Sequence, residues 1–458
     1  MREKCAVFGI KSDSDVYSYI YMGLYALQHR GQESAGIATY RDEEIKLYKN
    51  MGLVSEVFRD VDMQGNVGIG HVRYSTTGDS KLQNAQPLLI NYALGSFAIA
   101  HNGNIVNSKE LRDTLERKGN IFSTSSDTEV IAHIIAREHI NTGDIVEGIK
   151  KTMEYLEGAY SLTILYGDKL IAVRDPHGIR PLVYGEKNGT HAIASETCAL
   201  DAIEVNFSRD VKPSEILVIS DSGVESHSGY KGNVCHCMFE YVYFARPDST
   251  LNGRSVFEVR KNLGRNLYHE GVNKLPETDA DLVIPVPNSG ITTAIGFSEE
   301  SGIYYSEGLM KNTYVGRTFI LPEQKMRDFG VKVKLNPIIS EIEGRDVVLV
   351  DDSIVRGTTQ KRLIKLLKDA GAEKVHVRIA CPPIKYPCFY GIDMQTKIEF
   401  IAAKKSVEQI RKTIGADSLL YTSQEGLVEA IGLPKEKLCM ACLTGEYPIR
   451  KTQTKLVD

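Results

Sequence analysis

The segment from Asp346 to Thr359, DVVLVDDSIVRGTT, constrains the fold more than any other part of the sequence. Its apolar run Val347–Val350 is typical of a strand buried on both faces, as strands of parallel sheets are. The next residues, TTQKRLIKLLKDAG, have the apolar spacing of a helix that ends near Gly371. A strand, a short polar turn and a helix predict a phosphate site, because the N–H groups of the turn and the positive helix end both face the anion.

Two carboxylates lie where this strand is predicted to end. Asp351 and Asp352 would repel each other unless a cation or hydroxyl groups lay between them. A divalent ion and the vicinal hydroxyls of a sugar both meet that need, so the acids and the turn together predict a site for a sugar phosphate. Two adjacent aspartates alone would indicate only solvated acids in an ordinary turn. The strand, the turn and the helix together favour the sugar-phosphate site.

A second buried strand, in DLVIPVPNSG at residues 281–290, also ends in a polar turn. In a parallel sheet it would end beside Asp351 and Asp352. Ser289 could then join the two acids around a hydrated Mg²⁺, which prefers a few protein oxygens together with substrate phosphates. The alternative, from the residues alone, is that Ser289 simply caps a helix.

The segment between the two strands, residues 311–337, is rich in Lys and Arg. Such a segment is normally a solvated loop. Its place between the two strands of the site suits a flap that closes over pyrophosphate, with Lys332 as one of the residues that bind it.

Cys5 opens a short strand, CAVFGI, near the start of the chain. It could be a small buried apolar residue, or a thiol nucleophile that works with a histidine. It could also become the first residue once Met1–Lys4 are removed. Its own α-amine, with an ordinary pKa of about 7.7–8, would then be the base.

Two further motifs of the first half contain polar residues on or beside a predicted strand. HVRYSTTG, at residues 71–78, places Arg73 where it could bind a carboxylate in bidentate fashion or form a surface salt bridge. HNGN, at residues 101–104, is predicted to be a tight turn at a strand end. In that place the amide of Asn102 and the N–H of Gly103 could stabilise an oxyanion.

The motif SSDTE is predicted to begin a helix. Ser126 and Glu129 have the spacing of a capping box, which is a sufficient structural explanation for Ser126. Asp127 is then left at the positive end of the helix, where it could bind the ammonium group of an amino acid.

Eight cysteines are too few for a disulfide scaffold in a chain of 458 residues. Cys439 and Cys442 form a CxxC pair that could ligate zinc, a 4Fe–4S cluster or nothing. The spacing does not select their partners. A zinc site that uses Cys235, His236 and Cys237 is therefore an alternative to a cluster.

Length and composition indicate an ordinary globular protein of two or three domains. The net charge of −4 gives no reason to expect nucleic acid as a partner, and no apolar run approaches the ~20 residues that span a bilayer. The first residues have no apolar leader segment, so we expect a cytoplasmic protein without membrane contact. A Gly/Ser-rich stretch at 225–237 suggests a boundary, and we expect domains at 5–230 and 261–458 with a linker at 231–260.

Taken together, these motifs carry a resemblance to a known family. DVVLVDDSIVRGTT resembles the phosphoribosylpyrophosphate (PRPP) signature of type I phosphoribosyltransferases, in the wording of the glutamine PRPP amidotransferases that begin purine synthesis. Cys5, HVRYSTTG, HNGN and SSDTE, in this order, resemble the glutamine amidotransferase domain of the N-terminal-nucleophile hydrolases. The resemblance covers nearly the whole chain. It implies an α/β and α+β protein, in which an αββα sandwich precedes a type I phosphoribosyltransferase parallel sheet.

The resemblance also implies roles for residues of the first half. Cys5 is the nucleophile that splits glutamine, which requires removal of Met1–Lys4. Arg73 and Asp127 bind the carboxylate and the ammonium group of glutamine, Asn102 and Gly103 form the oxyanion hole, and Arg30 supports the site rather than being a surface charge. The segment 174–181 recurs in the hydrolase family, and we assign it a structural role.

In the second half the resemblance implies that ammonia displaces pyrophosphate from PRPP and gives 5-phosphoribosylamine. The implied PRPP-binding residues are Asp351, Asp352, Ser353, Ile354, Val355, Arg356, Gly357, Thr358, Thr359 and Lys332, and the implied Mg²⁺ ligands are Ser289, Asp351 and Asp352. Similarity to the cluster-bearing members of the family implies a 4Fe–4S cluster on Cys237, Cys388, Cys439 and Cys442. The family further implies inhibition by purine nucleotides and a homo-oligomer, either a dimer or a tetramer.

Two other functions remain open at this point. A glutamine amidotransferase could act on another acceptor, as in hexosamine synthesis, but the DDSIVRGTT signature argues against a sugar-isomerase half. A non-catalytic PRPP or nucleotide sensor would have no use for Cys5, Asn102 and Asp127.

Overall fold

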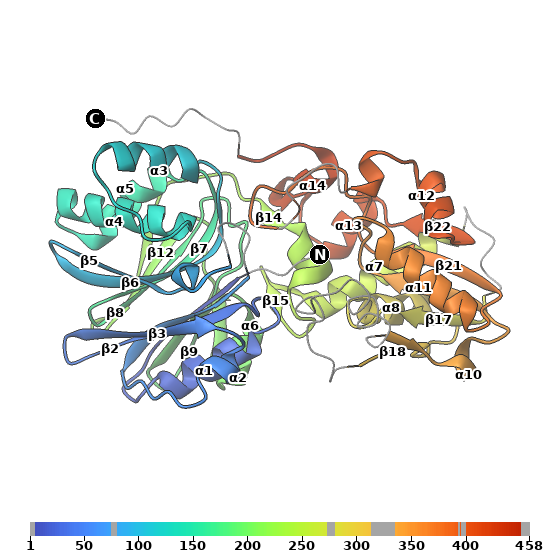
Figure 1. Ribbon diagram of the computed structural model, residues 1–458, viewed down its shortest axis with the longest axis horizontal. Helices are drawn as coiled ribbons and strands as arrows, with labels where there is room; N and C mark the ends of the chain where they lie inside the picture. The colour runs from blue at the N-terminus through green and yellow to red at the C-terminus, as the bar shows by residue number, and fades with distance from the viewer. Residues whose placement is uncertain are drawn as a thin grey trace.

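The structure is a computed structural model that describes residues 5–74, 80–272, 280–312, 335–392, 394 and 400–449. Its two halves lie side by side, with a seam of short helices and strands between them (Figure 1). None of the helices in the described ranges is both long enough and apolar enough to cross a membrane.

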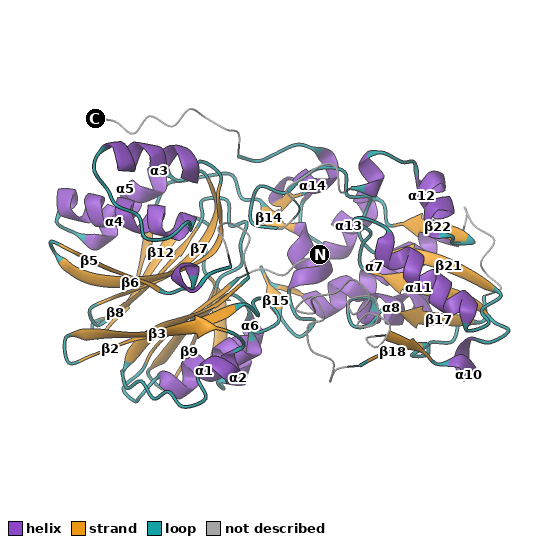
Figure 2. Cartoon of the chain, in the orientation of Figure 1, coloured by secondary structure: helices purple, strands orange, loops and turns teal. Residues whose placement is uncertain are grey.

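The first half is a four-layer sandwich of two antiparallel sheets between two layers of helices (Figure 2). The sheets have the strand orders β11-β9-β10-β1-β4-β2-β3 and β13-β12-β8-β7-β6-β5. In chain order the elements are β1 (Ala6–Lys11), α1 (Tyr17–Ala26), β2 (Ser34–Arg41), β3 (Glu44–Met51), α2 (Val54–Val57), β4 (Val67–Arg73), η1 (Leu82–Asn84), β5 (Leu88–Tyr92), β6 (Gly95–Ile105), α3 (Ser108–Arg117), α4 (Asp127–Thr142), α5 (Ile145–Tyr155), β7 (Gly158–Tyr166), β8 (Lys169–Arg174), β9 (Val183–Lys187), β10 (Thr190–Ala194), α6 (Thr197–Ala202), β11 (Asn206–Asp210), β12 (Glu215–Ser220) and β13 (Gly223–Ser228).

The alternation of side chains along each strand builds these layers. On β1, Val7 packs with Leu165 and Leu170 between the two sheets, whereas Phe8 and Ile10 pack against α1 and α6. The outer face of the second sheet packs in the same way against α3, α4 and α5. Every central strand is therefore buried on both faces, although the sheets are antiparallel.

The seam begins with β14 (His236–Cys237) and the π-helix η2 (Glu240–Phe244), followed by β15 (Thr250–Leu251) and β16 (Arg254–Ser255). The aromatic and β-branched residues of CMFEYVYFARPDST predict a strand. That prediction is wrong, because Glu240–Phe244 form a π-helix. The buried Arg260 donates hydrogen bonds to the carbonyls of Tyr241 and Ala245, both at 2.8 Å. These bonds satisfy two backbone carbonyls that, in a strand, would accept hydrogen bonds from a neighbouring strand.

The second half contains a parallel sheet in the order β17-β20-β21-β22, with helices on both faces. In chain order the elements are α7 (Val256–Val272), β17 (Leu282–Pro285), α8 (Ile291–Ser301), β18 (Leu309–Lys311), β19 (Leu335–Pro337), α10 (Ile339–Ile342), β20 (Asp346–Asp351), α11 (Thr358–Asp369), β21 (Lys374–Ile379), η6 (Ile401–Ala403), α12 (Val407–Ile414), β22 (Ser418–Tyr421), α13 (Gln424–Ile431), η7 (Lys435–Lys437), β23 (Leu438–Cys439) and α14 (Ala441–Thr444).

Strand β20 explains why this sheet is buried on both faces. Val347 and Leu349 pack with α11 and α12 on one face, and Val348 and Val350 pack with α7 and α8 on the other. The continuous apolar run of the sequence therefore forms the buried parallel strand that it predicts. The polar residues that follow β17 and β20 meet at one edge of the sheet.

Residues 438–444 return to the seam. Strand β23 pairs in parallel with β14, and Cys439 lies opposite Cys237. A large apolar cluster surrounds this pair and unites residues of β14, η2, α7, α13 and α14. The seam is thus built from segments that are far apart in the sequence.

Candidate functional site

Cys5 lies directly before β1 and is buried. Its thiol donates a hydrogen bond to the carbonyl of Tyr74 at 3.3 Å. Burial raises the pKa of the thiol, and the positive charge of Arg73 opposes that rise. Residues 1–4 lie outside the described residues, so their predicted removal stays a prediction.

Arg73 and Asp127 both lie close enough to Cys5 to act on its pKa. Arg73 ends β4, which pairs with β1 through Val72 and Ala6, so the register brings Arg73 alongside the nucleophile. Asp127 is the first residue of α4, and its carboxylate accepts a hydrogen bond from the N–H of Ile105 at 3.0 Å. Burial opposes the charged form of Asp127, but the charge and hydrogen bond of His101 lower its pKa below the ordinary value.

The start of α4 differs from the predicted capping box. Ser126 is the N-cap, as expected, and accepts a hydrogen bond from the N–H of Thr128 at 3.2 Å. Glu129 accepts hydrogen bonds from the N–H groups of Ser123 and Thr124 instead of Ser126, each at 2.7 Å. The capping-box prediction is therefore wrong, because the loop before the helix turns its own N–H groups toward Glu129.

The HNGN motif is the last part of strand β6, and the predicted turn is wrong. Asn102 and Gly103 pair with Ser161 and Tyr160 of β7. The side-chain nitrogen of Asn102 is buried and has no hydrogen-bond partner among the described residues. Gly103 has a φ of +155°, and a Cβ on it would lie 1.9 Å from the carbonyl oxygen of Ala159, so only glycine fits there.

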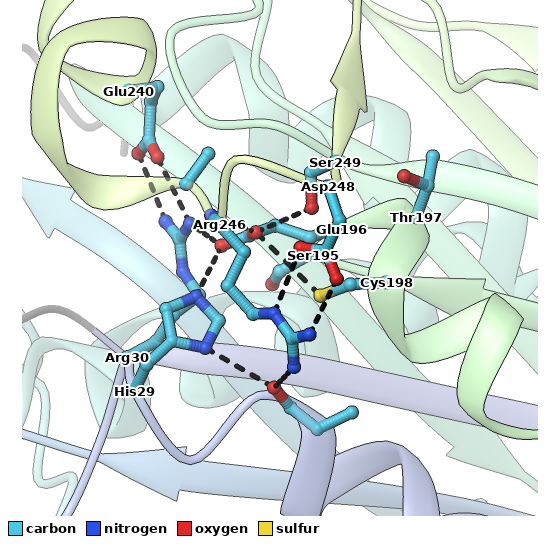
Figure 3. A network of polar contacts seen from close by, with 12 residues as sticks. His29, Arg30, Ser195, Glu196, Thr197, Cys198, Glu240, Arg246, Asp248 and Ser249 are labelled. Atoms are coloured by element: carbon cyan, nitrogen blue, oxygen red, sulfur yellow. Dashed lines mark hydrogen bonds and ion pairs between the residues drawn. The ribbon is translucent and has the colours of Figure 1, made fainter. Parts of the chain in front are cut away.

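Arg30, Glu196 and Glu240 form a buried ionic network (Figure 3). Arg30 donates from Nε to the carbonyl of Cys5 at 3.3 Å, and its two terminal nitrogens bind the Glu240 carboxylate at 3.0 Å each. Arg30 also binds Glu196, which accepts a further hydrogen bond from Ser249 at 2.8 Å. Burial opposes the charged form of Glu196, yet the charges of His29 and Arg30 hold its pKa below the usual range.

The family resemblance implied a supporting role for Arg30, but nothing in the sequence indicated its partners. Glu196 follows β10 and Glu240 opens η2, so both are far from Arg30 in the chain. A buried arginine requires buried carboxylates as partners. This rule could have pointed to Glu196 and Glu240 only if the burial of Arg30 had been known beforehand.

The second candidate site lies where β17 and β20 end. The hydroxyl of Ser289 donates a hydrogen bond to Asp351 at 3.1 Å, so the two polar turns meet as predicted. Gln360 of α11 also binds Asp351, and Ser353 binds Asp352. Burial raises the pKa of Asp351 well above its usual value, and the neighbouring charge of Asp352 raises it further.

The turn between β20 and α11 combines buried and exposed residues. Ile354 is buried against the sheet, while Arg356, Thr358 and Thr359 are exposed around the first turn of α11. Gly357 is the N-cap and has a φ of +76°. Ser353 and Val355 are partly buried. No described side chain caps this helix end, an arrangement that suits the binding of an anion.

The predicted flap cannot be placed against this site. Residues 313–334, which include Lys332, lie outside the described residues. The ends of the segment form the antiparallel pair β18 and β19, in which Leu309 lies opposite Pro337.

The four cysteines predicted as cluster ligands gather at the seam. Every pair among them lies close enough for electrostatic interaction; the four are Cys237, Cys388, Cys439 and Cys442. Burial raises the pKa of Cys237 and of Cys388 to about 12, and the charge of Arg180 opposes that rise. The described ranges contain no group of three or more His, Cys, Asp or Glu side chains arranged to hold a metal ion.

Comparison with known proteins places this geometry in a family. A family model described as a glutamine amidotransferase domain matches residues 71–202. The chain is 51% identical to the amidophosphoribosyltransferase of Methanocaldococcus jannaschii, with 99% of each chain covered. It is 47% identical to amidophosphoribosyltransferase 2, chloroplastic, of Arabidopsis thaliana, with 99% of this chain and 81% of that one covered. The solved glutamine PRPP amidotransferase of B. subtilis, complexed with ADP and GMP, matches with a TM-score of 0.91 and 45% identity over 99% of both chains.

The chain belongs to the amidophosphoribosyltransferase family. This membership confirms the predicted fold class, in which the sandwich precedes the phosphoribosyltransferase sheet. It also confirms the predicted enzyme, a glutamine-dependent amidophosphoribosyltransferase of purine synthesis. The roles of single residues in this amidophosphoribosyltransferase fold rest on the geometry given above.

Proposed function

We propose that the chain joins two reactions, the hydrolysis of glutamine at Cys5 and the displacement of pyrophosphate from PRPP at residues 351–359. The observation that carries the proposal is the position of Cys5 directly before β1, within electrostatic reach of one cation, Arg73 of the paired strand β4, and one anion, Asp127 at the start of α4. This pair of charges is complementary to the carboxylate and the ammonium group of glutamine. The proposed domains are residues 5–230 for the first reaction, 261–458 for the second and a linker at 231–260.

In the first reaction the sulfur of Cys5 attacks the side-chain amide carbon of glutamine. The oxyanion that forms is stabilised by the amide of Asn102 and the N–H of Gly103, and the unpartnered nitrogen of Asn102 supports this role. The carbon–nitrogen bond then breaks and ammonia leaves, with its third proton from the thiol. Water hydrolyses the thioester to glutamate and restores the thiol. Removal of Met1–Lys4 would make the α-amine of Cys5 the base for these proton transfers.

In the second reaction the nitrogen of ammonia attacks C1 of PRPP. The bond from C1 to the pyrophosphate oxygen breaks, and loss of one proton gives 5-phosphoribosylamine. The turn at Arg356–Thr359 binds the 5-phosphate, and Asp351 and Asp352 bind the ribose hydroxyls. The carboxylates also face the positive charge that develops on the sugar as pyrophosphate leaves.

The same acids fit a Mg²⁺ ion. Ser289, Asp351 and Asp352 supply only oxygen donors, the kind that Mg²⁺ prefers. Burial and the neighbouring charge of Asp352 raise the pKa of Asp351, so a positive charge between the two acids would stabilise them. Bound Mg²⁺ would supply charge that neutralises the departing pyrophosphate. Lys332 is proposed as a further PRPP ligand.

We propose a 4Fe–4S cluster on Cys237, Cys388, Cys439 and Cys442, and the proposal rests on their donor chemistry and common surroundings, since the described side chains are not already arranged as a metal site. Thiolate ligands need positive charge nearby, and Arg180 acts on three of the four with an Nε that has no hydrogen-bond partner among the described residues. The cluster would tie the seam to the end of the chain. Iron and acid-labile sulfide near four each per chain are expected, and active protein loaded with zinc and free of iron would refute the cluster.

Regulation and assembly follow from the family. The B. subtilis relative is complexed with ADP and GMP. We propose that purine nucleotides inhibit this chain by occupying the phosphate turn at 351–359, and that the chain forms a homo-oligomer, a dimer or a tetramer.

The decisive experiment measures glutamate and pyrophosphate from glutamine, PRPP and Mg²⁺, with each substrate omitted in turn. Near-equal release of both products, with little glutamate in the absence of PRPP, is the expected result. Glutamate without pyrophosphate would indicate another acceptor. Tight PRPP binding with neither product would instead indicate a sensor.

A further inference from the structure

The second half touches the proposed oxyanion hole through one short loop. Residues Cys388–Gly391, here called the 388–391 loop, lie against the end of β6. The side-chain nitrogen of Asn104 donates a hydrogen bond to the carbonyl of Phe389 at 2.8 Å. Asn104 directly follows Gly103, so a residue of the second half is fixed one position away from the proposed oxyanion donor.

Gly391 lies even closer to that donor. A Cβ on Gly391 would lie 3.0 Å from both the carbonyl carbon and the carbonyl oxygen of Gly103. Gly391 also has a φ of +95°, which L side chains rarely adopt. The two glycines therefore meet backbone to backbone, and no side chain can be added to Gly391 without a shift of a few tenths of an ångström in one of the two segments.

A second set of contacts joins the same loop to Cys5. The buried Arg180 donates hydrogen bonds from Nη2 to the carbonyl of Tyr390 and from Nη1 to Glu240 at 3.0 Å. Glu240 holds Arg30 with two hydrogen bonds (Figure 3). Arg30 in turn donates a hydrogen bond to the carbonyl of Cys5. One continuous buried network thus connects the loop to the backbone of the nucleophile.

We propose that the 388–391 loop is a positioning element that fixes the backbone after Gly103, and through Gly103 the direction of its N–H, for glutamine hydrolysis. The proposal rests on the oxyanion role of Asn102 and Gly103. An oxyanion hole acts only when its donors are held in place before the reaction. The pairing with β7 holds the Gly103 segment from one side, and its other side needs a restraint as well. The hydrogen bond from Asn104 and the backbone contact of Gly391 supply that restraint from the second half. Gly391 and Asn104 are therefore positioning residues, without contact to the substrate.

The test compares Gly391→Ala with Gly415→Ala in the full-length protein. Gly415 ends α12 with a φ of +80° and has open space around its Cβ position, so alanine there meets the same backbone strain but touches nothing. We expect Gly391→Ala to lower kcat for glutamine about 10-fold, because displacement of reacting groups by less than 1 Å has effects of this order. The KM for glutamine should not change, since Arg73 and Asp127 are untouched. Synthesis from ammonia and PRPP should equal that of Gly415→Ala.

A second variant removes a contact without adding an atom. Asn104→Ala should lower kcat for glutamine with the same unchanged KM and the same ammonia-dependent rate. A kcat for glutamine within about twofold of that of Gly415→Ala, in both Gly391→Ala and Asn104→Ala, would overturn the proposal. If Gly391→Ala also loses ammonia-dependent synthesis, Asn104→Ala alone decides.

Asn102→Ala distinguishes failure of this proposal from failure of the proposed function. A large loss of kcat for glutamine in Asn102→Ala, with none in Gly391→Ala and Asn104→Ala, would retain the oxyanion hole and reject the positioning loop. An unchanged kcat in Asn102→Ala would reject the oxyanion assignment on which the proposal rests.

Discussion

The two candidate sites of this chain lie on sheets of different kinds. The glutamine site is assembled from Cys5, β4, β6 and the start of α4 in an antiparallel sandwich, so its residues are spread over more than a hundred positions of the sequence. The PRPP site lies at the edge of a parallel sheet, and most of its residues are consecutive, from Asp351 to Thr359. In a parallel sheet one strand end and the following turn can form most of a site, whereas an antiparallel sandwich must bring separate strands together.

This difference makes the two sites separable by experiment. Free ammonia can replace glutamine as the nitrogen source, so changes in the glutamine site should spare ammonia-dependent synthesis. Changes in the PRPP site should abolish synthesis from either source.

The largest effect is expected for Cys5→Ser. Loss of the thiol should lower glutamine-dependent synthesis more than about 10³-fold, since no second nucleophile replaces it. Ammonia-dependent synthesis should stay intact. Cys198→Ser, at another buried cysteine of the same half, is the matched control and should keep both activities. Glutamine-dependent turnover by the Cys5 variant would reject the nucleophile.

Asp351→Asn should lower synthesis from both glutamine and ammonia by about 10²–10³-fold. The change keeps the shape of the side chain but removes the negative charge of the carboxylate, which would otherwise face the sugar and Mg²⁺. Asp346→Asn, at the other end of the same strand, should keep both activities. Full ammonia-dependent synthesis by the Asp351 variant would place the second reaction elsewhere.

Asp127→Asn sharpens the description of the glutamine site. Removal of this buried charge should raise the KM for glutamine about 10²-fold, because the ammonium group of glutamine loses its partner. Steady-state kinetics with glutamine and with ammonia separate this effect from a general loss of activity. Asp113→Asn on α3 is the control. A lower kcat at unchanged KM would assign Asp127 to the chemistry instead of to binding.

The smallest expected effect concerns stability. His71 is fully buried on β4, its Nε2 lies 3.0 Å from the carbonyl oxygen of His101, and its Nδ1 has no hydrogen-bond partner among the described residues. Burial lowers the pKa of His71 to about 3. Between this value and the ordinary pKa of about 6.5, the unfolded chain binds more protons than the folded one, so stability is lost as the pH falls below about 6.5.

From pH 7 to pH 5 this loss amounts to about 2 kcal/mol in the free energy of unfolding. Urea denaturation at both pH values should show a smaller difference for His71→Gln than for the unchanged protein. His269→Gln, at an exposed histidine, should leave the difference unaltered. An equal pH dependence in the His71 variant would contradict the prediction.

The same contrast explains what could be predicted from the sequence. The strand, turn and helix at 346–369 are formed by consecutive residues, so local sequence patterns predict them. The position of Ser289 beside Asp351 follows from the rule that parallel strands end at one edge of the sheet. The HNGN segment was mistaken for a turn, because Asn and Gly favour turns and nothing local shows that β7 pairs with them. The aromatic run at 239–244 was mistaken for a strand, because its conformation is fixed by Arg260 from a later helix. The partners of Arg30 are equally remote in the sequence.

The pairing of β14 with β23 has a consequence for how the chain is made. Residues 236–237 lie near the middle of the chain, but the strand that completes their pairing contains residues 438–439. During synthesis at about 5–20 residues per second, a nascent chain therefore holds an incomplete seam for on the order of ten seconds or more. The glutamine half can form its sheets in that interval, but its junction with the acceptor half closes only after residues 438–439 emerge. Assembly at the ribosome thus delays the joining of the nitrogen-releasing half to its partner until the site that consumes the ammonia has been synthesised.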